Sequence, residues 1–519
     1  MEKVLLSIDC GTQSLRALLF SFKGELLDKV QISYEPYYSL HPGWAEQDPE
    51  LYWDSLCKAC QTLKKKTPSL FENIAGIGVT TLRASMVNVD AHGNPLRPIM
   101  TWLDQRLAEP VYDPGVFMKL ILKMVGMGEP FVATQRGGKG NWIQQNEPEI
   151  WKKTHKYMQV SGFLNCRLTG EFADSVASQI GHIPFHYKKL RWGKPGDILH
   201  FAGRCFPMEP EKLPLLVKPG EQIGKVIKRA AEQTGLPHGI PVFACGSDKG
   251  CETIGMGVLD QSVASLSFGT TATVQCTSRK YFETIPFMPP YPAPIPGHYN
   301  PEVEIFRGYW MISWFKKEFA YPEVLEAMEK GIPPEVALNG LLKEAPAGSM
   351  GLVVQPYWSP GLKEPAAKGA MIGFGDVHTR AHVYRAVIEG LAYGLLDSMR
   401  KMEKRGKSVF KKLAVSGGAS QSDEICQISA DVMNLPLIRG QTFETSGLGA
   451  ALVTAKGLGV YPSFETAIQE MVHYGQEFEP DQGNAALYHE LFERVYQKMY
   501  RSLEPLYQEI RAITGYPEK

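Results

Sequence analysis

Three short turns in the sequence have the residue types that bind phosphate groups. Small residues at a turn let successive backbone N–H groups point at one anion, as a polyphosphate requires. Each turn follows a run of apolar residues that predicts a β-strand. One such turn is common in proteins that bind nothing there, but three in one chain, with carboxylates at strand ends, predict a phosphate site. The three turns are Gly11-Thr12-Gln13, Gly269-Thr270 and Gly417-Gly418.

Two aspartates stand at the ends of predicted strands. Asp9 lies two residues before Gly11, and a carboxylate there supplies the oxygen that Mg²⁺ prefers as a ligand. Asp248 follows the predicted strand 241–244 and lies between Gly246 and Gly250. A carboxylate beside a substrate hydroxyl can accept its proton as a phosphoryl group is transferred. The alternative role for Asp248 is a turn cap, which its spacing alone favours.

The two common nucleotide-binding signatures are not met. Gly406-Lys407-Ser408 resembles the end of a Walker A loop, but Lys401 stands where the loop's first glycine belongs and no strand precedes it. Gly447-Leu448-Gly449 is half of a dinucleotide fingerprint, with Leu452 where glycine or alanine should follow. The sequence therefore disfavours a P-loop enzyme and a Rossmann enzyme.

The elements that must position these residues alternate between strands and helices, which predicts an α/β fold. The unit strand, Gly-Thr turn, strand occurs near residue 11 and again near residue 269, which suggests an internal duplication. Residues 286–301 contain seven prolines and predict an ordered, extended loop. Strands are predicted at 4–8, 15–20, 74–81, 241–244 and 263–267, and helices at 49–66, 380–404, 421–433 and 484–512.

Composition narrows the class of protein. The 519 residues allow two large domains or about three domains of average size. Lys plus Arg and Asp plus Glu both number 55, so no overall positive charge attracts nucleic acid or a membrane surface. No run of about 18 apolar residues predicts a membrane span. The nine scattered cysteines predict free thiols in a reducing, cytoplasmic compartment, and Cys57 and Cys60 read as one ordinary helix face.

A longer set of motifs runs along nearly the whole chain. In order, these segments are IDCGTQSLRALLF, HPGWAEQDPELYW, GIGVTTLRASMVNVDAHGNPLRPIMTWLDQR, CGSDKG, SLSFGTTATV, GAMIGFGDVHTRAHVYRAVIEGLAYGL, SGGASQSDEICQISADVMNLPL and ETSGLGAA. Together they resemble the FGGY family of carbohydrate kinases, including its first phosphate turn and the segment that bears its catalytic aspartate.

The resemblance implies two actin-like, ribonuclease-H-like domains with the active site in the cleft between them. Residues 1–255 would form the sugar-binding domain and residues 256–519 the ATP-binding domain. Asp248 would be the general base, and Asp9 would hold Mg²⁺ largely through water. The nucleotide would contact Gly11, Thr12, Gln13, Gly269, Thr270, Gly417, Gly418 and Ser422. The substrate would contact Arg83, Trp102, Asp104 and Asp248.

The resemblance divides between two substrate types. Arg83 and Trp102 resemble the glycerol-kinase version of the pattern, but Ala84 and Lys249 stand where that version has Glu and Gln. Xylulose kinases carry Met-His near Arg83, which this chain lacks, although its second phosphate turn is closer to theirs. Lys249 either contacts a carboxylate or phosphate of the substrate or points outward.

We therefore expect an ATP-dependent phosphotransferase that acts on an alcohol group of a small sugar or polyol, with a ketopentose such as xylulose or ribulose preferred. Glycerol or another polyol is the alternative substrate. A nucleotide-switched sugar sensor without turnover is the alternative from another class, and the presence of both Asp9 and Asp248 argues against it. The expected partners are a small sugar or polyol, no nucleic acid and no membrane, with a homodimer considered beside a monomer.

Overall fold

The computed structural model describes residues 3–194, 196–197, 200–359 and 366–516, which form two compact units. The first unit comprises Met1–Leu259, Thr277–Asn300 and Glu444–His473, and the second comprises Asp260–Cys276, Pro301–Phe443 and Tyr474–Lys519. The division into consecutive domains 1–255 and 256–519 stays a prediction, because two later segments return to the first unit. One of these segments contains nearly all of the proline-rich loop.

The first unit is built on a six-stranded sheet with the order β13-β14-β5-β1-β2-β3. β1 pairs in parallel with β5, and β5 pairs in parallel with β14. The carboxyl ends of these three strands therefore lie at one edge of the sheet, where open α/β sheets bind ligands. The strands are β1 (Val4–Cys10), β2 (Ser14–Ser21), β3 (Leu26–Ser33), β5 (Ile74–Thr81), β13 (Gln222–Lys225) and β14 (Pro241–Phe243).

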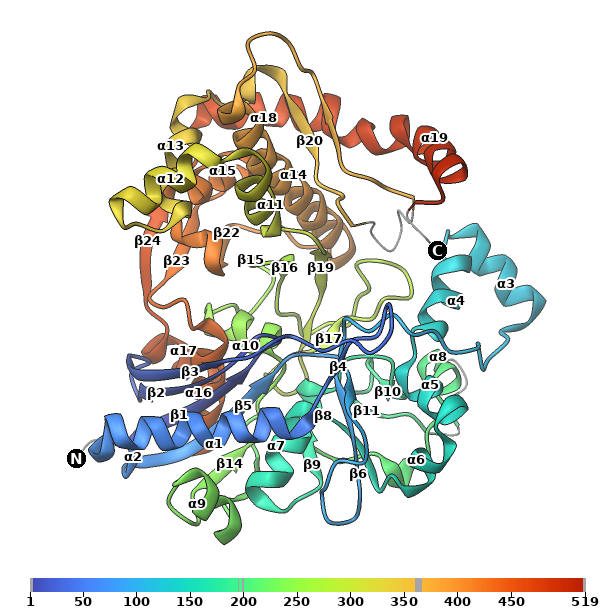
Figure 1. Cartoon of the computed structure of the whole chain (residues 1–519), viewed down its shortest axis with the longest axis vertical. Helices are drawn as coiled ribbons and strands as arrows, with labels where there is room; N and C mark the ends of the chain where they lie inside the picture. The colour runs from blue at the N-terminus through green and yellow to red at the C-terminus, as the bar shows by residue number, and fades with distance from the viewer. Residues whose placement is uncertain (1–2, 195, 198–199, 360–365, 517–519) are drawn as a thin grey trace. The chain divides into compact units, whose positions relative to one another are not determined.

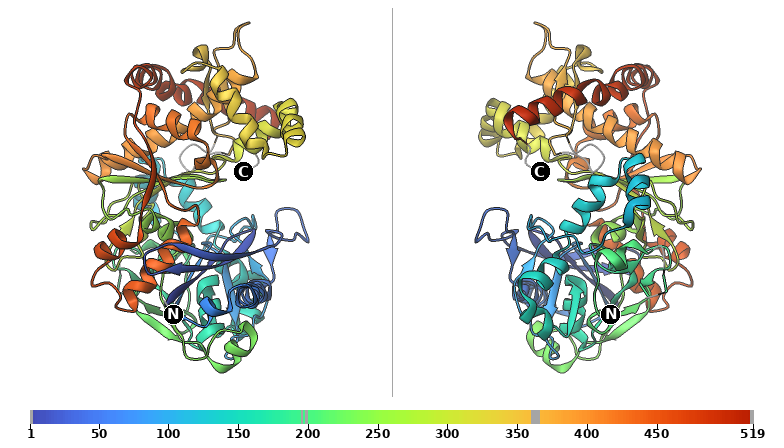
Figure 2. Two further views of the ribbon diagram at one scale, coloured as in Figure 1. Left: turned by 90° about the vertical axis from the view of Figure 1, so that its left-hand side faces the viewer. Right: turned by 90° about the vertical axis from the view of Figure 1, so that its right-hand side faces the viewer.

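Helices cover both faces of this sheet, so that β1 is buried along its whole length. Leu6 and Ile8 pack in the same core as residues of α1 (Pro49–Lys66) and α7 (Val160–Thr169). Leu5, which directly precedes Leu6, packs in the core formed with α16 (Thr445–Gly457) on the opposite face. Figures 1 and 2 show α1 along one side of the sheet and α16 along the other. This alternation explains why the strand reads as a nearly continuous apolar run.

The second unit repeats this plan in a six-stranded sheet with the order β19-β16-β15-β22-β23-β24. β15 pairs in parallel with β22, as β1 does with β5. The structure therefore confirms that the strand–turn–strand unit occurs twice. The strands are β15 (Val263–Phe268), β16 (Ala272–Gln275), β19 (Glu302–Ile305), β22 (Lys412–Ser416), β23 (Leu437–Gly440) and β24 (Tyr474–Phe478). The long α14 (Arg380–Gly406) packs beside α15 (Asp423–Met433) in this unit (Figure 1).

Several predicted elements are confirmed, including the helix 49–66 and the strand 74–81. The final helix predicted for 484–512 is also present, with a local irregularity that the sequence did not indicate. The π-helical turn Phe492–Tyr496 lies between α18 (Gln482–Leu491) and α19 (Gln497–Thr514), and the backbone stays helical throughout. Both ends of this wider turn are aromatic rings that pack against Tyr393. In the described part of the chain, none of the helices has the length and apolar character of a membrane span.

Candidate active site

The strand ends of the first unit bring three predicted site residues into one neighbourhood. Asp9 lies on β1, and Arg83 lies two residues beyond β5. Asp248 is the first residue of α10 (Asp248–Gly255), which follows β14. An isolated bridge between Thr81 and Ser247 joins the ends of these two segments. Nε of Arg83 consequently lies 3.9 Å from Oδ1 of Asp248.

Asp248 is placed where a carboxylate can act on a substrate. Ser247 caps α10, since its Oγ accepts a hydrogen bond of 3.2 Å from the backbone N–H of Gly250, so Asp248 is not needed as the cap. The side chain of Asp248 keeps 28% of its surface exposed. Burial raises the pKa of Asp248, while the charges of Arg83 and Lys249 act in the opposite direction. A raised pKa makes the carboxylate a stronger proton acceptor than an ordinary aspartate.

Asp9 belongs to an ion-pair chain that sequence reasoning missed. Nη1 of Arg16 lies 3.2 Å from Oδ2 of Asp9 and 3.3 Å from Oε2 of Glu444, and Nζ of Lys29 lies 2.9 Å from Oε1 of Glu444. Burial raises the pKa of Asp9 to about 7, Arg16 opposes this rise, and Asp248, Glu444 and Glu252 add to it. Arg16 could have been found, because it sits opposite Asp9 in the β1–β2 hairpin register.

Lys249 pairs with a carboxylate of its own helix. Its Nζ lies 2.6 Å from Oε2 of Glu252, three residues further along α10. The attraction of Glu252 and Asp248 raises the pKa of Lys249 even though burial acts to lower it. The ammonium group therefore stays charged beside Asp248, and its direct contact with a substrate stays a prediction.

The first phosphate turn, Gly11-Thr12-Gln13, is closed by hydrogen bonds and contacts Trp102, which was predicted to bind the substrate. The N–H of Gly11 donates to the carbonyl of Ser14 at 2.9 Å, and Oη of Tyr34 donates to the carbonyl of Gly11 at 2.8 Å. Nε1 of Trp102 donates to Oγ1 of Thr12 at 3.0 Å. Trp102 thus lies against the turn, while Gln13 is exposed beside it.

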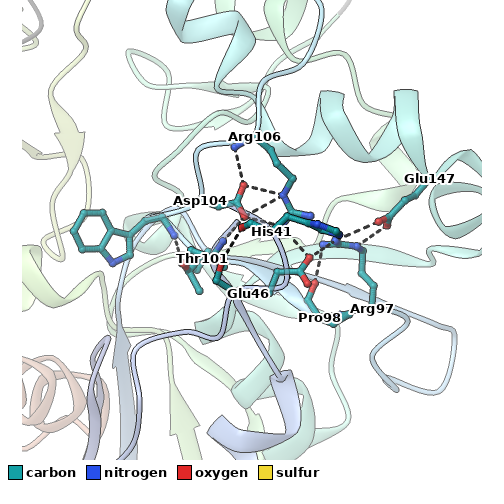
Figure 3. A network of polar contacts seen from close by, with 12 residues as sticks. His41, Glu46, Arg97, Pro98, Thr101, Asp104, Arg106 and Glu147 are labelled. Atoms are coloured by element: carbon teal, nitrogen blue, oxygen red, sulfur yellow. Dashed lines mark hydrogen bonds and ion pairs between the residues drawn. The ribbon is translucent and has the colours of Figure 1, made fainter. Parts of the chain in front are cut away.

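Asp104 is held in a buried polar network (Figure 3). Its Oδ2 accepts hydrogen bonds from the N–H of Ala45 at 2.8 Å and from Nη2 of Arg106 at 2.6 Å, and its Oδ1 accepts from Nε of Arg106 at 2.9 Å. Its side chain is completely buried. Arg106 also pairs with Glu46, and its guanidinium packs against the rings of Trp44 and Trp142. Both oxygens of Asp104 are therefore engaged by the protein, and it positions the loop that carries Trp102.

In the second unit, two of the predicted turns meet. β15 and β22 run in parallel with Ser267 opposite Ser416, so the glycines that follow them are neighbours. Gly417 has φ +91°, and a Cβ on it would lie 2.7 Å from the backbone carbonyl carbon of Phe268. Only glycine allows this approach of the third turn to the backbone just before Gly269-Thr270. Gly418, in contrast, has open space around its α-carbon.

Ser422 caps α15 after the third turn. Its Oγ accepts a hydrogen bond of 3.2 Å from the N–H of Ile425 and donates one of 2.7 Å to Oδ1 of Asn339. Asn339 lies on α13 (Pro334–Glu344), so the cap ties two helices of the second unit together. Any contact of Ser422 with a nucleotide would add to this structural role.

The residues near Asp9 fit a magnesium ion that takes few ligands from the protein. In the part of the chain that the structure describes, no group of three or more His, Cys, Asp or Glu side chains forms a metal site. Mg²⁺ commonly binds through one or two carboxylates, with water and substrate phosphates completing its shell. Asp9, a buried carboxylate at a strand end beside a phosphate-type turn, is of this kind.

Comparisons with known proteins identify the family of the chain. The model of the FGGY family of carbohydrate kinases, N-terminal domain, matches residues 4–255, and that of the C-terminal domain matches residues 264–458. The chain is 29% identical over 493 residues to the uncharacterized sugar kinase YgcE of Escherichia coli, covering 94% of this chain and 91% of that protein. It is 28% identical to the xylulose kinase of Lactococcus lactis, covering 96% of each chain.

Solved structures show the same fold. The xylulose kinase from Rhodospirillum rubrum is 26% identical with a TM-score of 0.81, covering 98% of this chain and 100% of that one. The gluconate kinase from Lactobacillus acidophilus has the same TM-score of 0.81 at 21% identity, with coverage of 98% and 100%. The similarity to the Rhodospirillum rubrum enzyme supports both the fold and an evolutionary relationship. The similarity to the Lactobacillus acidophilus enzyme supports the fold alone.

Proposed function

Because the chain belongs to the FGGY family of carbohydrate kinases, we propose that it phosphorylates a ketopentose such as xylulose or ribulose. The family makes it an ATP-dependent phosphotransferase with an alcohol acceptor. The single observation that supports the acceptor site is Arg83 paired with Asp248 at 3.9 Å, where the strand ends of the first unit meet. The similarity to the xylulose kinases of Lactococcus lactis and Rhodospirillum rubrum favours a ketopentose over a polyol. Ala84, where glycerol kinases have Glu, argues against glycerol.

Each residue of the proposed site has one task in the reaction. Asp248 accepts the proton of the attacking hydroxyl group, and burial prepares it for this by raising its pKa. Arg83 holds Asp248 in place with its charge, and its guanidinium is the group that we assign to substrate oxygens. Trp102 lies against the turn at Thr12 and limits the space above it. Lys249 contributes charge beside Asp248 through its pair with Glu252.

The nucleotide is assigned to the glycine turns. We assign the terminal phosphate to the backbone of Gly11, Thr12 and Gln13, and the other phosphates to Gly269 and Thr270. The adenosine is assigned to the neighbourhood of Gly417, Gly418 and Ser422. Mg²⁺ held near Asp9 would neutralise charge on the terminal phosphates. The nine buried cysteine thiols support our proposal of a reducing, cytoplasmic compartment.

A substrate panel tests the proposal. ADP release is measured with xylulose, ribulose, hexuloses, gluconate, pentitols, erythritol and glycerol, each at several concentrations. We expect a ketopentose to give the highest kcat/KM. A higher kcat/KM for glycerol or a pentitol would replace the proposed substrate. ADP release that no sugar accelerates, despite sugar binding, would favour the sensor.

A further inference from the structure

Lys139 is a charged side chain for which the structure provides no partner. It is the first residue of α5 (Lys139–Asn146) and is half-buried. Across the described residues, its Nζ forms neither a hydrogen bond nor an ion pair. The surrounding protein lowers the pKa of Lys139 to about 8 because burial disfavours the charged form. Proteins rarely leave an ammonium group in such surroundings without an oxygen to bind.

The carboxylate nearest to Lys139 is already engaged by other residues. The charges that act on it are those of Asp104 and Arg106, and the two oxygens of Asp104 accept hydrogen bonds from Arg106 and Ala45. His182, an exposed side chain, is the third neighbour. Nδ1 of His182 donates to the carbonyl of Gly137 at 2.9 Å, two residues before Lys139. The ammonium group is thus held near fixed groups and remains able to donate hydrogen bonds.

A continuous set of contacts joins this position to the proposed acceptor site. Gly181, next to His182, is so close to Ala84 that a Cβ on Gly181 would lie 3.3 Å from the α-carbon of Ala84. Ala84 directly follows Arg83 and has the unusual φ of +53°. Such a φ is strained for a non-glycine residue, and residues of this kind cluster at functional sites. The backbone between Arg83 and His182 is therefore tightly fitted.

Two tyrosines complete the link from the other side. Oη of Tyr187 donates to the carbonyl of Gly181 at 3.2 Å. The ring of Tyr187 lies 6.3 Å from that of Tyr291, and the guanidinium of Arg83 lies 5.1 Å above the Tyr291 ring. Packed residues of the first unit therefore connect Arg83 with His182, which binds the segment just before Lys139.

We propose that Nζ of Lys139 donates hydrogen bonds to oxygen atoms at the end of the sugar opposite to the hydroxyl group that is phosphorylated. This inference rests on the proposed function and makes Lys139 a specificity residue of the same site. The chemistry that it recognises is an oxygen acceptor, either the hydroxyl groups of a neutral ketose or the carboxylate of a sugar acid. An ammonium group binds both, and the carboxylate more strongly.

The first test compares Lys139→Met and Lys139→Arg with Lys152→Met, which removes an exposed lysine of the neighbouring α6 (Pro148–Lys153). Loss of one charge-assisted hydrogen bond should lower kcat/KM for the preferred sugar by about 10- to 100-fold in Lys139→Met. Lys139→Arg should recover part of this loss, and KM for ATP should change little in all three. A loss restricted to gluconate identifies the carboxylate as the ligand, and a loss with ketoses identifies hydroxyl groups.

A second readout uses the wild-type enzyme and no turnover. The amine of Lys139 is acetylated with an N-hydroxysuccinimide ester at pH 7.5, and modification at each lysine is followed by mass spectrometry. The preferred sugar, without ATP, should protect Lys139 at least fivefold and leave Lys152 unchanged. Equal modification with and without saturating sugar overturns the proposal, as does a folded Lys139→Met variant with normal kcat/KM. A wild-type enzyme that phosphorylates no ketose instead contradicts the proposed function, and protection by whichever sugar it does accept still decides the role of Lys139.

Discussion

The two six-stranded sheets share one plan and carry different chemistry at equivalent strand ends. Read from β3 to β13, the pairings of the first sheet are antiparallel, antiparallel, parallel, parallel and antiparallel. The second sheet has the same succession from β19 to β24. In each sheet, the first strand of the parallel group ends in a Gly-Thr turn.

The difference lies two residues before each turn. Asp9 occupies that place in the first sheet, with Arg16 beside it, and the neutral Ser267 occupies it in the second. The parallel partner strand leads to Arg83 in the first unit and to Gly417 in the second. Equivalent strand ends thus present charged side chains in the first unit and a neutral serine and a glycine in the second. The backbone plan fixes where groups lie, and the residue types decide what they do.

The largest expected effect follows from removing the proposed proton acceptor of the first unit, Asp248. Asp248→Asn keeps the size of the side chain and should lower kcat by about 10²- to 10⁴-fold, the usual range for a general base. Nucleotide binding, measured by calorimetry with ADP, should stay near the wild-type value. Sugar-dependent turnover that remains at the wild-type rate would remove Asp248 from this role.

Asp9→Ser gives the first turn the residue found at the equivalent place in the second. Turnover at limiting Mg²⁺ should fall by about 10- to 100-fold, as for other groups that hold a metal through water. The folded-state pKa of Asp9 is raised to about 7, so its stabilising contribution is present below its unfolded pKa and is lost as pH rises through 7. The melting temperature of the variant at pH 8 should therefore exceed that of the wild type. A lower melting temperature combined with unchanged metal dependence would make Asp9 a structural residue.

The role of the glycine turn in the second unit can be tested at Gly417, where its backbone approaches that of Phe268 most closely. Gly417→Ala places a methyl group against Phe268 and requires φ +91°, which should lower the free energy of unfolding by about 1–3 kcal/mol. The displaced turn should also raise KM for ATP while KM for sugar stays constant. Gly418→Ala is the matched control, because its methyl group meets open space, and it should change stability by no more than about 0.5 kcal/mol. Equal effects of the two substitutions would show that the close approach is unimportant.

The sequence predicted the strand ends better than the side-chain partners. The apolar runs 4–8 and 74–81 and the turns after them were visible because buried parallel strands read as continuous hydrophobic segments. Asp104, in contrast, belongs to a motif that resembles a substrate segment, yet both its oxygens are used inside the protein. Glu444 lies 428 residues from Arg16 along the chain, and its pairing depends on the return of α16 to the first unit. Such contacts arise from tertiary packing and leave no local pattern to read.

The smallest expected effect concerns the acid that faces Arg16. The charge of Glu444 raises the pKa of Asp9, and the same carboxylate draws Arg16 away from it. Glu444→Gln removes both influences, so the pKa of Asp9 should fall. If ionised Asp9 is required for turnover, the acidic limb of the pH–rate profile should lie near pH 7 in the wild type and move down by less than about one unit in the variant. Lys29→Met is the opposing control, because Glu444 then loses one of its cationic partners and should attract Arg16 more strongly. Movement of the limb to lower pH in Lys29→Met, or none in Glu444→Gln, would show that the chain from Lys29 through Glu444 and Arg16 does not control Asp9.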